Sequence, residues 1–326
     1  MKKILQSTEF AIACVLLVAM VLIGLVNPAF WGFDNLFSLA KSNVVIGIMA
    51  LGVLLVMISG GIDVSFPAFA VAALYIVVRA MVALQYDGVF LPFVAAALIG
   101  LGLGAFNALI IERFRMIPLI VTLGTASIVR GLLLGLLGSS IVNINKMPKE
   151  LIAFGKHDLV TVEAANGATY GLTAMVLVYL GIGIAMHLVL RHTMIGRSVY
   201  AYGTDAEAAR RAGFNTRRTI WFVYCTAGLL AGFAGILHTS MIWQANPRDF
   251  QGMELDVIAA VVLGGASIFG GRGSVLGTLI GVFMLVMVKN SLILLKVDTT
   301  WQRVVVGLII VAATAITAWR DRRKLV

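Results

Sequence analysis

The feature that most constrains this chain is a succession of apolar runs, each about 20 residues long, separated by short polar turns. A helix rises about 1.5 Å per residue, so a run of this length crosses a hydrocarbon core of roughly 30 Å. Lipid offers no hydrogen bonds to the backbone, which favours helices for such runs. Only 12% of the residues are charged, against about 25% in soluble domains. The chain is therefore predicted to be an all-α integral membrane protein.

We expect about ten spans and treat residues 1–326 as a single transmembrane domain. The first run follows Lys2 and Lys3, as in a signal peptide, but it is long enough to span and no small-residue cleavage site follows it. Two longer polar segments interrupt the pattern, 140–169 and 191–218. The expected spans cover residues 8–26, 37–58, 63–84, 90–111, 118–138, 170–190, 219–241, 254–269, 274–295 and 301–319.

The distribution of Lys and Arg predicts the orientation. With the N-terminus inside, most of the 25 basic residues fall in inside segments, as the positive-inside rule expects. Both termini and segment 191–218 are then cytoplasmic, and segment 140–169 lies outside. The net charge of +10 is explained in this way and does not indicate nucleic-acid binding.

Segment 191–218 contains the signal of a short helix. Thr204, followed three residues later by Glu207, has the pattern of a capping box, and good helix formers follow until Gly213 offers a left-handed stop. A basic, capped helix between two spans can dock on a partner, or it can be a solvated loop that only sets orientation. The residues of this candidate helix are Thr204, Asp205, Glu207, Ala208, Arg210, Arg211 and Gly213.

Two glycine-rich turns with an aspartate predict an internal repeat. GGIDV at 60–64 opens the third span, and GMELDV at 252–257 opens the eighth. The two spans enter from opposite sides, so spans 2–5 and 7–10 would form an inverted repeat, as in many transporters; coincidence between two turns is the alternative. The acids would cap the helix starts or, less simply, act in a proton relay. The candidate caps are Gly61, Asp63, Glu254 and Asp256.

The sequence shows no catalytic or metal-binding pattern. Walker A, HExxH, GxSxG and CxxC motifs are absent, the four histidines are scattered, and both cysteines lie in apolar runs. We expect no enzyme activity, no metal and no cofactor. Charges inside the spans are candidates for the transport path, although each can also snorkel to the headgroups; these are Lys41, Arg79, Arg130 and Lys289. Asn43 and Asn107 are expected to bond between helices, and glycines spaced by four residues to bring helices close.

Four motifs in order resemble a known family: SGGIDVS, NALIIERFRMIPLIVTLGT, GRSVYAYGTDAEAARRAGFNTRR and ELDVIAAVVLGGASIFGGRGSVLGTLIG. Over residues 35–320 the chain is similar to permease subunits of bacterial ABC importers for ribose-type monosaccharides, related polyols and autoinducer-2. The resemblance implies an inner-membrane permease that works as a dimer. Cytoplasmic ATPase subunits would hydrolyse ATP, and a periplasmic or lipid-tethered binding protein would deliver the sugar.

The resemblance also implies roles for two segments. Thr204–Gly213 would be the coupling helix that seats in the ATPase, and the turn Gly270, Gly271, Arg272 and Gly273 a further cytoplasmic contact. The chain departs from the family at Phe66-Pro67, where a Val-Gly pair is usual after a GGIDLS motif, and at Tyr202, where a glycine is usual. A branched-chain amino-acid permease is the alternative within the fold group. An ion-coupled secondary transporter is the alternative from another class.

Overall fold

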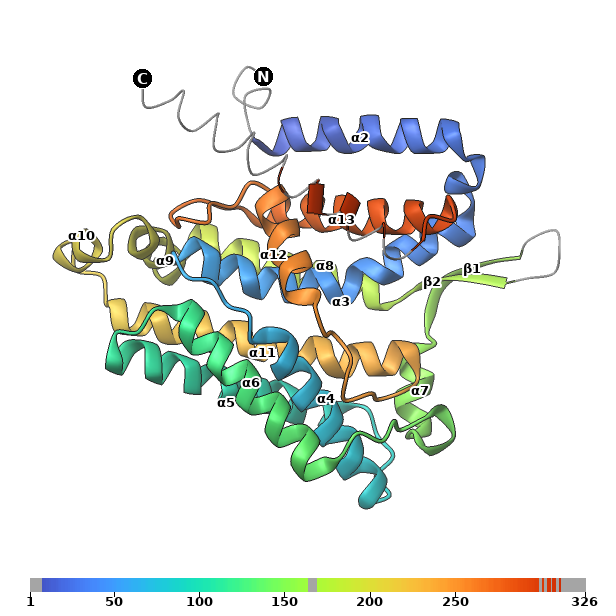
Figure 1. Cartoon of the computed structure of the whole chain (residues 1–326), viewed down its shortest axis with the longest axis horizontal. Helices are drawn as coiled ribbons and strands as arrows, with labels where there is room; N and C mark the ends of the chain where they lie inside the picture. The colour runs from blue at the N-terminus through green and yellow to red at the C-terminus, as the bar shows by residue number, and fades with distance from the viewer. Residues whose placement is uncertain are drawn as a thin grey trace.

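The computed structural model describes residues 8–163 and 169–298, together with positions 301, 304, 305, 307, 308 and 311. It is a bundle of helices that run mostly along one direction, with a two-stranded sheet at one end and the short helices α9 and α10 at the other (Figure 1). Most of the tenth predicted span, 301–319, lies outside the described residues. The helices of the bundle are α2 Thr8–Val26, α3 Phe33–Ile58, α4 Phe66–Ala83, α5 Phe90–Phe114, α6 Pro118–Leu137, α8 Met175–His192, α11 Thr216–Ile242, α12 Met253–Leu263 and α13 Val275–Leu294.

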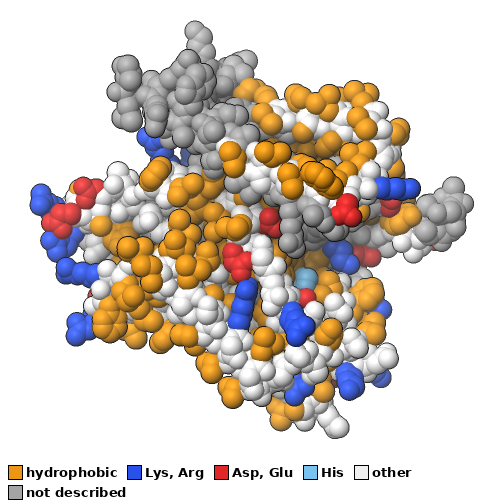
Figure 2. Space-filling view, in the orientation of Figure 1, with side chains coloured by type: hydrophobic (Ala, Val, Ile, Leu, Met, Phe, Trp, Pro, Cys, Tyr) orange, Lys and Arg blue, Asp and Glu red, His pale blue; other side chains and the backbone are white. Residues whose placement is uncertain are grey.

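The prediction of an all-α membrane protein is confirmed. Within the described residues, seven helices are long and apolar enough to cross a bilayer, namely α3, α4, α5, α6, α8, α11 and α13. Helix α2 covers the first predicted span, 8–26. The eighth span, predicted over 254–269, is wrong in length: α12 has 11 residues and ends at Gly264, because the left-handed Gly265 follows. Apolar side chains cover much of the surface between the two ends, as Figure 2 shows.

The end opposite α10 is formed by segment 140–173. It contains the 3-10 turn η2 Ile144–Lys146, the helix α7 Lys149–Gly155, and an antiparallel hairpin of β1 Asp158–Glu163 and β2 Thr169–Thr173. The sixth span was predicted to start at 170, but the chain is still in β2 there, and α8 begins at Met175. We call this end the hairpin end and the other the α10 end.

Close glycine contacts hold the centre of the bundle together. Helix α11 crosses α5 where Gly228 and Gly232 face Gly100 and Ala96, so closely that a Cβ on any of the three glycines would overlap backbone of the other helix. Gly281 brings α13 equally close to the Ala260 carbonyl of α12. The predicted use of regularly spaced glycines for helix packing is confirmed. Helix α3 lies inside the bundle. All of its residues from Val44 to Ile58 are buried apart from Ile46.

Helices α4 and α12 start after extended turns and run in opposite directions. The turn before α4 leaves α3 at the α10 end, whereas the turn before α12 leaves α11 at the hairpin end, where Ala245 pairs with Val142. Each turn contains a left-handed glycine, Gly60 or Gly252. This arrangement agrees with an inverted relation between the two parts of the chain, and the equivalence of spans 2–5 with 7–10 stays a prediction.

Candidate functional site

The polar stretch 191–218 folds into two short helices, α9 Met194–Thr204 and α10 Ala206–Arg211. Helix α9 was not predicted. It begins where the Thr193 Oγ1 accepts a hydrogen bond from the Gly196 amide at 3.1 Å. The buried residues Gly196, Ser198 and Val199 face the bundle. Helix α9 therefore connects the exposed α10 to the membrane-spanning helices.

The predicted capping box is wrong by one residue. Thr204 is the last residue of α9, and its Oγ1 donates to the Tyr200 carbonyl at 2.9 Å. The N-cap of α10 is Asp205, whose Oδ1 accepts from the amides of Glu207 and Ala208 at 2.9 and 3.0 Å. The cause is the length of α9: once Thr204 is helical, only Asp205 has the extended backbone that an N-cap needs.

Helix α10 presents charged side chains to solvent. The Glu207 carboxylate forms ion pairs with Arg210 and Arg211, the i+3 and i+4 neighbours, instead of reaching back to the Thr204 amide. Ala209 is buried beneath the helix. Gly213 has a φ of +88°, so it forms the predicted left-handed stop. The prediction of a short helix with a glycine stop is thus correct, although its cap is not.

Helix α9 meets two other parts of the chain at a glycine junction, formed by Gly60, Gly203, Gly270 and Gly271. A Cβ on Gly203 would overlap the Ile58 carbonyl oxygen at the end of α3, and one on Gly270 would come within 2.5 Å of the Gly203 oxygen. The Gly271 amide donates to the Ile58 carbonyl at 2.8 Å. The turn with the GGRG sequence therefore packs against both α3 and α9.

A tyrosine adds a polar contact to the same junction. The Tyr200 hydroxyl donates to the Gly273 carbonyl at 2.8 Å. Burial raises the pKa of Tyr200 and of Tyr202 above the ordinary value of a phenol. Arg272 lies between the half-buried Gly271 and Gly273 and is exposed. The junction was missed from the sequence, which gave no sign that the three segments would meet.

Gly61 and Asp63 were expected to cap the start of α4, but the N-cap there is Ser65, without a side-chain cap hydrogen bond. Gly61 does not cap: a Cβ there would lie 2.6 Å from the Tyr224 hydroxyl, so the glycine leaves room for that ring. Asp63 is buried, and its Oδ1 accepts from both the amide and the hydroxyl of Ser65 at 2.6 Å. Asn107 of α5 donates to the Ser65 hydroxyl at 2.9 Å. Asp63 thus fixes the turn that enters α4, which agrees with a structural role.

Glu254 and Asp256 were also predicted to be caps, and this is wrong. Helix α12 starts at Gly252 without any side-chain cap, and both acids form ion pairs with other helices. Glu254 pairs with Arg130 of α6 at 2.6 Å, and Asp256 pairs with Lys289 of α13 at 2.5 Å. Two of the four intramembrane charges identified in the sequence therefore hold the start of α12.

The other two charges have partners near the hairpin end. Lys41 lies over the Trp243 ring at 5.7 Å, and Arg79 reaches the Ser140 hydroxyl at 3.5 Å. Asn43 was expected to bond between helices, but its amide donates to the Leu39 carbonyl of its own helix. Asn107 does bond between helices, as predicted. Among the described residues, no group of three or more His, Cys, Asp or Glu side chains could hold a metal ion.

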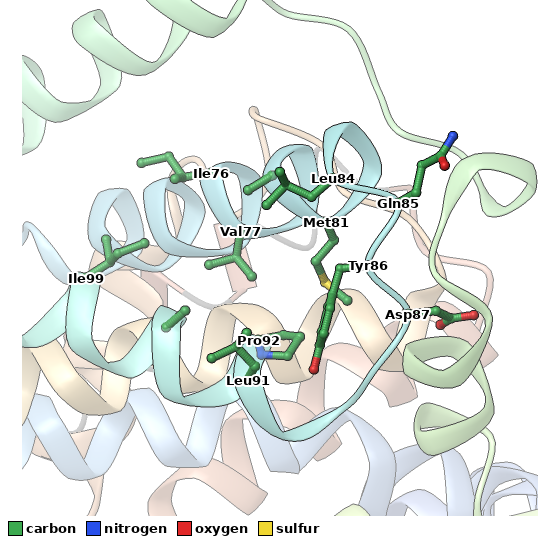
Figure 3. A pocket seen from close by; sticks show the side chains of 12 residues that line it. Ile76, Val77, Met81, Leu84, Gln85, Tyr86, Asp87, Leu91, Pro92 and Ile99 are labelled. Atoms are coloured by element: carbon green, nitrogen blue, oxygen red, sulfur yellow. The ribbon is translucent and has the colours of Figure 1, made fainter.

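A cavity of about 450 Å³ lies between α4 and α5, near the turn that joins them (Figure 3). Its lining is almost entirely apolar and includes Val77, Met81, Leu91 and Pro92. The polar side chains of Gln85 and Asp87 point away from the cavity in this view. A lining of this kind offers few partners to the hydroxyl groups of a sugar, so the cavity is not a candidate sugar site.

Comparisons with known proteins agree on the kind of protein. A family model described as "Branched-chain amino acid transport system / permease component" matches residues 35–314. The ribose import permease protein RbsC of Escherichia coli K12 is 33% identical over 92% of this chain and 91% of its own length. RbsC of Bacillus subtilis is 33% identical over 95% of this chain and 91% of its own length.

A third relative has a different named cargo. The autoinducer 2 import system permease protein LsrC of Yersinia enterocolitica is 30% identical over 89% of this chain and 76% of its own length. No solved structure matches the chain. The motifs at 59–65, 107–125, 196–218 and 254–281 all fall inside the matched region. This chain therefore belongs to the family of membrane permease components of bacterial ABC import systems.

Proposed function

We propose that the chain is the membrane subunit of an ATP-driven importer for a monosaccharide or a related small polyol. The observation that carries this proposal is helix α10, a capped and exposed helix held by α9 against both parts of the bundle. The full-length relatives named above are import permeases for ribose or autoinducer-2. The subunit would have no catalytic activity of its own, and partner ATPases would hydrolyse ATP.

The proposed orientation places the α10 end in the cytoplasm and the hairpin end outside. Both termini would then be cytoplasmic, in the inner membrane of a bacterium. Helix α10 would be the coupling helix that meets an ATPase, and the exposed Phe269 beside the GGRG turn would extend that contact. Segment 140–169 would face a binding protein that delivers the sugar, and a second permease would complete the path.

Of two other candidates, an amino-acid permease has one observation in its favour, whereas an ion-coupled transporter has one against it. The description of the matching family model names branched-chain amino acids, which favours an amino-acid permease. An ion-coupled transporter would need a free intramembrane carboxylate. Asp63 does not suit that role, because it is 2% exposed and is already engaged with Ser65. The sugar permease is favoured because the ribose permeases match over nine-tenths of both chains.

Uptake of labelled substrate into membrane vesicles tests the proposal. The permease is co-expressed with a candidate ATPase and a candidate binding protein, and ATP is enclosed in the vesicles. We expect uptake of labelled ribose or another monosaccharide to continue when an uncoupler collapses the proton gradient, and to stop with a non-hydrolysable ATP analogue. Loss of uptake with the uncoupler alone would contradict the ABC mechanism. Uptake of leucine in place of the sugar would establish the amino-acid permease.

A further inference from the structure

The start of α12 carries two ion pairs that connect three helices. Glu254 reaches Arg130 of α6, and Asp256 reaches Lys289 of α13. Because the two acids are two residues apart on one helix, they point to different sides and hold α12 between its neighbours. Leu255, which lies between them, is 71% exposed.

The packing of α12 on α13 gives the depth of these pairs. Gly264 lies beside Gly277, and Ala260 lies beside Gly281, so the two helices run antiparallel in a regular register. Continued by one turn, this register places Asp256 level with residue 285. That position is about 15 Å from the start of α13 at Val275, or about half of a 30 Å hydrocarbon core. In Figure 1, α12 accordingly begins near the middle of the bundle.

The four side chains are not enclosed by protein. The exposed fractions are 29% for Arg130 and 17% for Glu254 in one pair, and 35% for Lys289 and 25% for Asp256 in the other. Figure 2 shows acidic and basic side chains within the otherwise apolar middle of the face on which α12 lies. Charged groups in contact with lipid at this depth are strongly unfavourable and are found facing a water-filled space. The exposed side of these pairs therefore faces water.

We propose that the start of α12 forms the wall of the water-filled transport path, and that the two ion pairs are the charged groups that the substrate meets halfway across. This inference rests on the proposed function, and it adds the position of the path. Carboxylates accept hydrogen bonds from sugar hydroxyls, and the arginine and lysine donate to them. The two negative and two positive charges cancel. A neutral polyol therefore meets polar partners here, whereas no net charge is present to hold an ion.

Cysteine accessibility tests this assignment in the assembled transporter. Cys14 and Cys225 are first replaced by serine, and the variants Glu254→Cys, Asp256→Cys and Ile184→Cys are made in that background. Ile184 is the matched control, because it is 63% exposed at the middle of α8 and carries no charge. We expect a membrane-impermeant methanethiosulfonate reagent to modify positions 254 and 256 at least about tenfold faster than position 184. Equal, slow modification at all three would overturn the proposal, since the face would then be covered by lipid or by a dry protein contact.

A charge exchange provides a second readout. Glu254→Arg alone places two positive charges together, and we expect uptake to fall about tenfold or more while the protein still reaches the membrane. The double variant Arg130→Glu with Glu254→Arg restores the pair and should recover much of the uptake. If the exchange failed to recover uptake and the cysteines at 254 and 256 reacted slowly, the proposed position of the path would be rejected. The proposed function would still stand, provided that the wild type shows ATP-driven uptake. If uptake itself proved independent of ATP, the proposed function would fail, whereas accessibility at 254 and 256 would still be measured.

Discussion

At the scale of single residues, the cap of α10 shows what local sequence can and cannot specify. Thr204 and Asp205 are both good N-cap residues, and both precede the same helix-forming run. The choice between them depends on where α9 ends. That in turn depends on the packing of Gly203 against α3 and of Tyr200 against Gly273, which are contacts with distant parts of the chain. A capping pattern therefore predicted the helix correctly and its first residue incorrectly.

The corrected cap leads to a residue-level prediction. Asp205→Ala removes the acceptor for two amides of α10 and should cost about 1 kcal/mol of helix stability, or about fivefold in the local folding equilibrium. We expect substrate-stimulated ATPase activity of the assembled complex to fall several-fold, while Asp205→Asn keeps most of it. Thr204→Val is the control and should be close to wild type, because its hydroxyl donates to a carbonyl within α9 and not to an amide of α10 in the described structure. A severe defect in Thr204→Val with none in Asp205→Ala would show that Thr204, and not Asp205, caps α10.

At the scale of helices and strands, the sequence predicted most of the long spans because hydropathy over about 20 residues is decided by the bilayer rather than by neighbouring helices. The eighth span failed for a local reason, since Gly264 and Gly265 end α12 after 11 residues. The hairpin of β1 and β2 was missed although the Asn166-Gly167 pair, which lies in the sequence between Val162 and Thr169, is a hairpin signal. The apolar residues from 170 onward were instead assigned to the following span.

The contact between α5 and α11 gives a prediction for one helix pair. Gly100→Ala would place a Cβ against the Gly228 carbonyl, and overpacking of this kind costs about 1–3 kcal/mol. We expect a clear decrease in the thermal stability of the detergent-solubilised protein, measured by fluorescence-detected size-exclusion chromatography after heating. Gly102→Ala is the matched control in the same helix, because its Cβ would meet no atom within 4 Å. Equal stability of the two variants would show that the helices are not in close contact.

At the scale of the whole molecule, the contacts that matter most connect residues far apart in sequence. Arg130 and Glu254, or Gly203 and Ile58, meet only after the helices have packed, so periodicity and motif spacing could not pair them. The sequence did identify the charged residues and the glycine turns as unusual. It assigned the acids to helix caps because an acid near a helix start is a local pattern, whereas an ion pair between helices is not.

The glycine junction gives the last prediction, because it connects α9 to both parts of the bundle. Ile58 and Gly60 precede α4, and Gly270 and Gly271 precede α13, so a movement of α10 can reach both turns through α9. Gly203→Ala would place a Cβ against the Ile58 carbonyl oxygen and separate α9 from α3. We expect this variant to insert and assemble with the ATPase, but to lose about tenfold or more of its uptake relative to its basal ATP hydrolysis.

Gly181→Ala is the matched control for that variant, since it lies in α8 and a Cβ there would meet no atom within 4 Å. It should transport like the wild type. The measurement is the number of sugar molecules imported per ATP hydrolysed, which distinguishes a loss of coupling from a loss of stability. A lower ratio for Gly203→Ala at normal membrane levels supports transmission through the junction, because the ATPase then works without moving the substrate. An unchanged ratio would mean that α10 acts on the spans by another route, and the packing of Gly203 would then serve stability alone.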